Sequence, residues 1–180
     1  YAGQIITFTF PHIGNVGANT KDFETDVPAA LGMITRQPVT SPANWRSESS
    51  LTDWLITHNL PAISGIDTRA LTRHIRDSGA PHGVLCHAPD GTIDTEALVK
   101  MAREWPGLNG MDLAREVTSS HQHSWNEGSW QMYANAHTKT PTAFNVVAID
   151  YGCKHNILRC LHDAGCNVTV VPADTSAADI

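Results

Sequence analysis

The chain has 180 residues, of which 41% are hydrophobic and 17% are charged, a composition typical of a globular protein. This length suits one sizeable domain, or one domain and part of another. The formal net charge is -6 and no basic block is present, which argues against a nucleic-acid partner. No apolar run reaches the roughly 18 residues that a membrane helix needs, and no signal sequence opens the chain. We therefore expect a soluble, cytoplasmic protein with no membrane partner.

The first segment, residues 4–10 (QIITFTF), predicts a strand because it consists mostly of apolar and β-branched residues. A strand this close to the first residue, with no initiator methionine before it, suggests a chain cut from something longer. The next stretch, residues 11–17 (PHIGNVG), indicates a tight loop in which Gly14 and Gly17 permit positive φ.

Three helices are predicted from capping residues followed by apolar residues at helical spacing. They cover residues 51–59, 68–78 and 95–105, after the caps Ser50, Asp67 and Asp94. Gly79 ends the second helix and Pro106 stops the third. The apolar residues expected on the inner faces of the three helices are Leu51, Trp54, Leu55, Leu71, Ile75, Leu98, Met101, Ala102 and Trp105. Two strands are expected between the helices, a buried one in residues 61–66 and another in residues 83–88.

The second helix carries Arg69, Arg73 and Arg76 at spacings of four and three, which places them on one face. This arginine face is a basic stripe on an otherwise acidic chain. It is explained either as an ordinary solvated face or as a protein interface, and the sequence leaves both open.

Residues 106–112 (PGLNGMD) follow the third helix and indicate a flexible break between domains. The stretch combines a proline with two glycines, and Gly107, Leu108, Asn109 and Gly110 form the candidate hinge. The predicted domains are residues 1–110, a connecting segment at 113–143 whose end has linker composition, and a second domain that begins at residue 144.

From residue 144 to residue 180 the pattern is that of a βαβ unit in a parallel sheet. Residues 145–150 and 167–173 are apolar strands, and residues 154–164 are a helix with Ile157, Leu158 and Leu161 inward that Gly165 closes. A further helix is expected to begin at Thr175 or Ser176. The turn at residues 150–152 (DYG) lacks the GxGxxG spacing, so a dinucleotide-binding oxidoreductase is weakly supported.

The cysteines and histidines provide no clear catalytic or metal site. Cys86, Cys153, Cys160 and Cys166 form no CxxC pair, and we expect reduced thiols, three of them in core segments. A metal site at His121 and His123 lacks a second ligand pair, so a polar loop is the better interpretation.

Cys153 is the one cysteine near a strand-to-helix turn, but the turn lacks the small residues of a nucleophile elbow. His155 lies two residues further along the helix and would point away from it. Asp150 and Lys154 are better candidates to line a site, because ligands gather at the carboxyl ends of parallel strands. The alternative for both is an ordinary solvated turn.

Five stretches together resemble the small subunit of glutamine-hydrolysing carbamoyl phosphate synthetase. They are QIITFTFPHIGNVG, ISGIDTRALTRHIRDSGAPHG, PGLNGMDLAREV, WNEGSW and VVAIDYGCKHNILRCL. The resemblance extends over essentially the whole chain in family order, and the IDTRALTR and PGLNGMD stretches are specific to that subunit.

The resemblance implies an α/β architecture of two domains. A mixed α/β amino-terminal domain docks on the large subunit of the heterodimer, and it is followed by the first βαβ unit of a doubly wound, flavodoxin-like class I glutamine amidotransferase domain. The stretch matching residues 106–112 is the hinge in this family. The enzyme hydrolyses glutamine and passes ammonia to the large subunit, which uses ATP with magnesium to make carbamoyl phosphate for arginine and pyrimidine synthesis.

The family's GxCxGxQ elbow and the histidine and glutamate of its triad match no residue here, so no catalytic, cofactor-binding or metal-binding residue is assigned. The family usually has alanine at Cys153, and its glutamine-binding serine precedes the residue that matches Tyr1. We therefore expect an incomplete catalytic subunit that supplies scaffold, hinge and docking surface. The alternative is a binding module without chemistry that recruits a partner through the arginine face.

Overall fold

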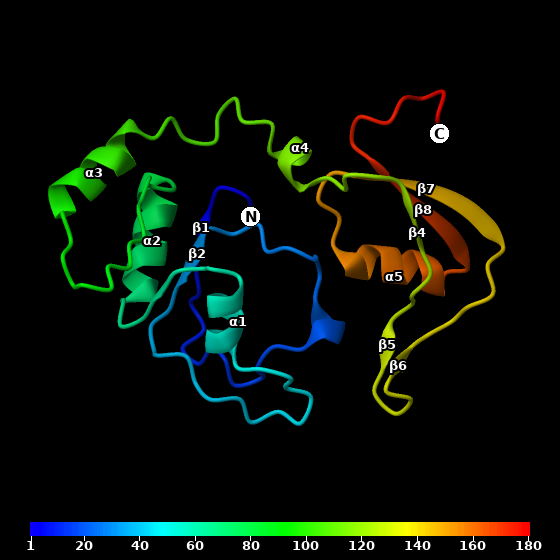
Figure 1. Ribbon diagram of the computed structural model, residues 1–180, viewed down its shortest axis with the longest axis horizontal. Helices are drawn as coiled ribbons and strands as arrows, with labels where there is room; N and C mark the ends of the chain where they lie inside the picture. The colour runs from blue at the N-terminus through cyan, green and yellow to red at the C-terminus, as the bar shows by residue number, and fades with distance from the viewer. The chain divides into compact units, whose positions relative to one another are not determined.

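The computed structural model describes residues 1–180 and divides into two compact units, which Figure 1 shows as a ribbon. Unit 1 comprises Tyr1–Thr20 and Pro28–Met111, and unit 2 comprises Lys21–Val27 and Asp112–Ile180. Both units combine helices with short sheets, which confirms the predicted α/β class. No helix combines the length and the apolar character that crossing a membrane requires.

A short parallel sheet in the order β1-β2-β3 runs through unit 1. Its strands are β1 (Ile5–Thr7), β2 (Gly32–Ile34) and β3 (Ala62–Ile63). β1 confirms the first predicted strand, but the expected burial of the strand in residues 61–66 is wrong, because β3 lies at the sheet edge with both residues exposed. The predicted strand at residues 83–88 is also wrong. This stretch joins no sheet, and the Leu85 side chain lies so near Gly32 that a Cβ there would be 2.9 Å from it.

The helices of unit 1 begin where their capping residues predicted. They are α1 (Leu51–Thr57), α2 (Thr68–Ser78) and α3 (Thr95–Glu104), and the 3-10 turn η1 (Thr20–Asp22) precedes them. The backbone N–H groups of Asp53, Ala70 and Ala97 donate at 3.0 Å to the side chains of Ser50, Asp67 and Asp94. The bond from Ala70 is the main reason that the pKa of Asp67 lies below its ordinary value.

The inner faces of these helices are less buried than the apolar pattern indicated. Leu55 on α1 is buried, whereas Leu71 and Ile75 on α2 are half-buried. No residue of α3 is buried, and its Met101 is 59% exposed, so the inward position predicted for that side chain is wrong. Only Leu98 and Ala102 of α3 are half-buried; they lie one turn apart on the same face, and Met101 lies outside that face.

Unit 2 contains the predicted βαβ unit. β7 (Phe144–Asp150) and β8 (Cys166–Pro172) pair in parallel from Phe144↔Cys166 to Asp150↔Pro172, and α5 (His155–Asp163) connects them. A third strand, β4 (His123–Trp125), pairs antiparallel with β8, so the sheet order is β4-β8-β7. The other elements of this unit are α4 (Leu113–Val117) and the hairpin strands β5 (Trp130–Gln131) and β6 (Ala136–His137).

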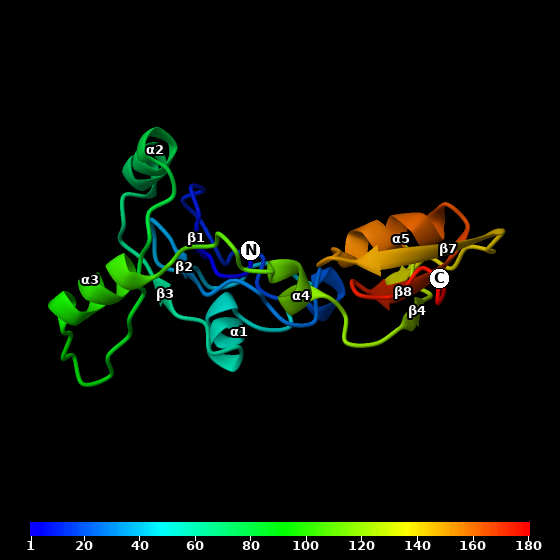
Figure 2. The same cartoon turned by 90° about the horizontal axis from the view of Figure 1, so that it is seen from above.

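α5 lies along one face of this sheet (Figures 1 and 2), and the core forms between them. Leu158 packs there with Cys166, Val168 and Val170. Ile157, which was also expected to face inward, is 54% exposed, because adjacent helical residues point about 100° apart. On the opposite face of the sheet the side chains of β7 are exposed, including Val147 and Ile149.

The segment at residues 113–143 is more than the connection that its composition indicated. It forms α4, β4 and the β5–β6 hairpin, and the carboxylate of Asp163 at the end of α5 fixes the hairpin. Asp163 accepts a hydrogen bond from the Ser129 N–H at 3.0 Å and another from the Thr138 hydroxyl. These bonds, from Ser129 first and then from Thr138, hold the pKa of Asp163 below its ordinary value. The unit boundary between Met111 and Asp112 falls inside the candidate hinge stretch, residues 106–112.

Two further expectations need correction. Residues 173–180 form no helix, and two turns close there, in which the Thr175 N–H donates to the Pro172 carbonyl at 3.2 Å and the Asp179 N–H donates to the Ser176 carbonyl at 3.0 Å. Of the four cysteines only Cys166 is buried, whereas Cys86 and Cys160 are exposed and Cys153 is half-buried. All four are free thiols.

Candidate functional site

The carboxylate of Asp150, at the end of β7, is bound by three backbone N–H groups. One oxygen accepts from Gly152 at 2.8 Å and from Cys153 at 2.7 Å, and the other accepts from Ser119 at 2.7 Å. The residue is 9% exposed. The side chain that was predicted to line a site is therefore directed into the fold, where it holds the strand-to-helix turn in place.

Thr118 joins the ends of β7 and β8. Its hydroxyl donates to the Asp150 carbonyl at 2.6 Å and accepts from the Ala173 N–H at 2.9 Å. Together with Ser119 it fixes the two strand ends across sequence separations of 31 to 55 residues. Sequence patterns do not predict contacts over such separations, so the roles of Thr118 and Ser119 were not expected.

The thiol of Cys153 lies beside this turn and is not activated. Partial burial raises its pKa, and the nearby charge of Asp150 raises it further. Its Sγ contacts the Lys154 carbonyl at 3.6 Å. The ring of His155 packs against Trp125, with centroids 4.8 Å apart. These surroundings favour the neutral thiol, which is a poor nucleophile.

Lys154 precedes α5 and is exposed, with extended backbone at φ -67° and ψ 135°. It makes no side-chain capping bond to the helix. The structure thus separates the two candidates for site lining, because the Asp150 carboxylate is engaged by backbone groups and the Lys154 side chain reaches solvent. Whether either contacts a ligand stays a prediction.

The candidate hinge has two glycines in the left-handed region, Gly107 at φ 81° and Gly110 at φ 83°. Between them a turn forms in which the Met111 N–H donates to the Leu108 carbonyl at 3.1 Å. Gly107 is buried, and a Cβ there would lie 3.1 Å from the His82 ring, whereas one at Gly110 would meet no atom within 4 Å. Substitution at Gly110 is therefore limited by backbone conformation and not by space.

The three side chains of the arginine face are exposed on α2. The structure pairs Arg76 with its neighbour Asp77 at 2.9 Å, in an exposed ion pair. A single exposed pair of this kind contributes little to stability. The face is thus available to a partner, and its role as an interface stays a prediction.

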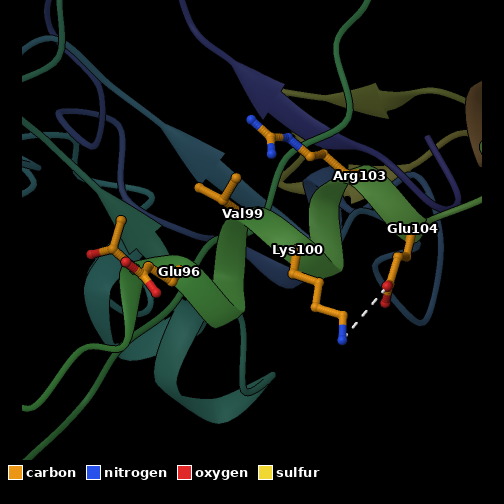
Figure 3. Close-up of a pocket in the computed structure, with 6 residues that line it drawn as sticks. Glu96, Val99, Lys100, Arg103 and Glu104 are labelled. Atoms are coloured by element: carbon orange, nitrogen blue, oxygen red, sulfur yellow. Dashed lines mark ion pairs between the residues drawn. The ribbon is translucent and has the colours of Figure 1, made fainter.

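His121 lies in the exposed stretch that leads into β4 and His123 is the first residue of β4, with ring centroids 6.2 Å apart. No group of three or more His, Cys, Asp or Glu side chains comes together that could hold a metal ion. A hollow lies along α3 and is shown in Figure 3. It is lined by Thr95, Glu96, Val99, Lys100, Arg103 and Glu104. Lys100 and Glu104 form an exposed ion pair at 3.8 Å in it, and every lining residue comes from this one helix.

Comparison with known proteins gives a consistent result along the whole chain. Residues 1–85 match the family model described as the CPSase domain of the carbamoyl-phosphate synthase small chain. The carbamoyl phosphate synthase small chain of Bradyrhizobium diazoefficiens is 53% identical over 184 residues, which cover 100% of this chain and 46% of that relative. The corresponding small chain of Ruegeria pomeroyi is 49% identical over 180 residues, with the same coverage of 100% and 46%. That of Rhizobium meliloti is 47% identical over 186 residues, again covering 100% and 46%. The chain therefore spans about half the length of the curated relatives it matches.

Proposed function

Because the chain is similar along its whole length to carbamoyl phosphate synthase small chains, we propose that it is part of a subunit that delivers ammonia for carbamoyl phosphate synthesis. The complete subunit hydrolyses glutamine, and the ammonia passes to a large subunit. There ATP with magnesium drives the synthesis of carbamoyl phosphate, which serves arginine and pyrimidine formation. The observation that carries this proposal is an identity near 50% that extends over all of the chain and is not confined to one motif.

The architecture of unit 2 supports this proposal. β7, α5 and β8 form a βαβ unit with a parallel strand pair, which is the repeating element of a doubly wound sheet. We assign it as the first such unit of a flavodoxin-like class I glutamine amidotransferase domain. The antiparallel strand β4 at the edge of the sheet is compatible with this assignment, since many doubly wound sheets carry one antiparallel edge strand.

The role assigned to these residues is mechanical and not chemical. Cys153 has a raised pKa, and its neighbour His155 packs against Trp125, so no activated nucleophile forms at the strand end. We assign the segment three tasks: to act as scaffold, to dock on the large subunit, and to connect the two units through the hinge at Gly107 and Gly110.

Reconstitution tests this function. The full-length protein that contains this chain is mixed with the large carbamoyl phosphate synthase subunit, and carbamoyl phosphate formed from glutamine is measured. The proposal expects synthesis from glutamine that requires both proteins, whereas synthesis from free ammonia requires the large subunit alone. Synthesis from glutamine that is independent of the small chain would contradict it.

A second candidate is a binding module without chemistry that uses the arginine face. It is favoured by one observation, that Arg69, Arg73 and Arg76 are all exposed on one helix of an acidic protein. The reconstitution separates the two functions. If the full-length protein associates with a partner but the complex releases no ammonia from glutamine, the result would support the binding module.

A further inference from the structure

The chain passes between the two units at three places and not at one. Unit 2 includes Lys21–Val27, although the residues on both sides of this segment belong to unit 1. The three crossings therefore follow Thr20, Val27 and Met111. A hinge at residues 106–112 is one of three covalent connections, and the segment 21–27, which we name the strap, supplies the other two.

The strap is attached to the first turn of α5 through Glu24. The His155 N–H donates to the Glu24 carbonyl at 3.1 Å, and the Asn156 N–H donates to the Glu24 carboxylate at 2.9 Å. The first N–H groups of a helix have no partner inside it, and Lys154 supplies no side-chain cap. Glu24 therefore caps a helix that begins 131 residues further along, and its charge suits the positive end of the helix dipole.

A buried cation on α5 reinforces this attachment. The side chain of Arg159 is 8% exposed, and its ion pair with Glu24 spans 4.0 Å. The guanidinium also donates to the Phe23 carbonyl at 3.3 Å and lies 5.8 Å from the centre of the Trp125 ring. Its Nε has no hydrogen-bond partner. Both hydrogen-bonding and ionic partners of this buried charge thus come from the strap, and losing them is costly.

The strap has a second anchor at the hairpin of unit 2. The Lys21 Nζ donates at 2.9 Å to the side-chain oxygen of Asn135, which lies in the turn between β5 and β6. Asn135 itself has a positive φ of 47°. The two anchors hold the strap at both a helix end and a hairpin turn, each more than 110 residues away in sequence.

We propose that residues 21–27 are a conformational strap whose attachment through Glu24 orders the amino-terminal turn of α5. When Glu24 is attached, the first turn of α5 is capped and Arg159 is neutralised. When it is released, the same turn frays next to the strand-to-helix turn that Asp150 holds. A displacement of the chain at Thr20 or Pro28 in unit 1 therefore reaches α5 through the strap, independently of the hinge.

Hydrogen–deuterium exchange on the full chain tests this proposal without any activity measurement, so its outcome is independent of the proposed function. Glu24→Ala is compared with Glu104→Ala, which removes an exposed ion pair of α3. Glu24→Ala removes the acceptor of the Asn156 N–H directly and keeps the backbone carbonyl that accepts from His155. We expect exchange at the Asn156 amide to accelerate by about tenfold, the effect of losing a helix cap, and exchange at the His155 amide to accelerate as well because the turn frays, with both amides unchanged in the control. Tryptic cleavage after Lys21 should accelerate in parallel.

Glu24→Gln retains an acceptor for the Asn156 N–H but removes the charge that pairs with Arg159. It should accelerate exchange at these amides less than Glu24→Ala does. If the alanine variant does not fold, exchange in Glu24→Gln still tests whether Glu24 orders the first turn of α5. Unchanged exchange at both amides together with unchanged cleavage after Lys21, in a folded Glu24 variant, would overturn the proposal.

Discussion

The three hydrogen bonds to Asp150 make its replacement the sharpest probe of unit 2. Asp150→Ala removes a buried carboxylate and leaves the N–H groups of Ser119, Gly152 and Cys153 without their acceptor. The same change weakens the junction between the ends of β7 and β8. If the side chain instead served mainly to line a site, the fold would tolerate its loss.

The magnitude follows from the number of bonds and their exposure. A hydrogen bond to a charged group contributes about 1.5–3 kcal/mol, so three independent bonds would sum to roughly 4.5–9 kcal/mol. They share one acceptor group, and water can reach Gly152, which is exposed. We therefore expect Asp150→Ala to lower the free energy of unfolding by about 3–5 kcal/mol, at the upper end of single-residue effects. Asp150→Asn should cost less, since its amide retains one oxygen.

The assay is urea unfolding followed by far-UV circular dichroism, with the free energy obtained by linear extrapolation. Lys154→Ala is the matched control at the same turn, because this side chain is exposed and caps nothing, and it should change the value by less than about 0.5 kcal/mol. A loss below about 1 kcal/mol for Asp150→Ala would refute the reasoning. It would mean that water replaces the carboxylate at all three N–H groups.

Three further predictions concern the core, the pH dependence and the surface. Leu158→Ala should destabilise unit 2 by about 2–5 kcal/mol in the same assay, because it leaves a cavity against the sheet, whereas the exposed neighbour Ile157→Ala should have a much smaller effect. Asp163 has a pKa lowered by hydrogen bonds from Ser129 and Thr138, so the stability it contributes is present above its unfolded pKa of about 4 and is lost as the pH falls through the lower folded value. The urea midpoint should fall with acidification in that window, and Asp163→Asn should flatten the fall; an identical slope in the variant would contradict this. Reversing the charge of the whole arginine face should weaken association with the large subunit more at low salt than at high salt. Reversing the charges of Lys100, Arg103 and Arg115 is the control and should not weaken it. Equal binding at every ionic strength would mean that the arginine face is a solvated surface and not an interface.

Local signals in the sequence were sufficient to predict where the helices begin and where the tight turns lie. A cap and its partner are three residues apart, so Ser50, Asp67 and Asp94 could be recognised without any tertiary information. Gly14 and Gly17 likewise adopt the positive φ values that their loop predicted. The strands β7 and β8 were found because both are long and apolar.

Features that depend on distant partners could not be found in this way. β2 and β4 have three residues each and gain their regularity from the strands beside them. Residues 83–88 have a strand-like composition, but a strand also requires a hydrogen-bonded neighbour, and this stretch joins no sheet. The bond from Asn156 to Glu24 spans 132 residues, and no local pattern encodes it.

We propose that the hinge at Gly107 and Gly110 couples glutamine hydrolysis to synthesis in the complete subunit. Gly110→Val in the full subunit, bound to the large subunit, tests it most directly, because a β-branched residue cannot adopt φ 83° without strain although no atom blocks its side chain. Gly91→Val is the matched control, with φ 75°, equally open surroundings and a position in a surface turn outside the hinge. Three rates are measured on each folded variant: glutamine hydrolysis, synthesis from glutamine and synthesis from free ammonia. We predict that Gly110→Val lowers synthesis from glutamine by about tenfold or more while the other two rates stay within about twofold, and that the control leaves all three unchanged. A parallel loss of all three rates in Gly110→Val, or an unchanged ratio between them, would contradict the claim.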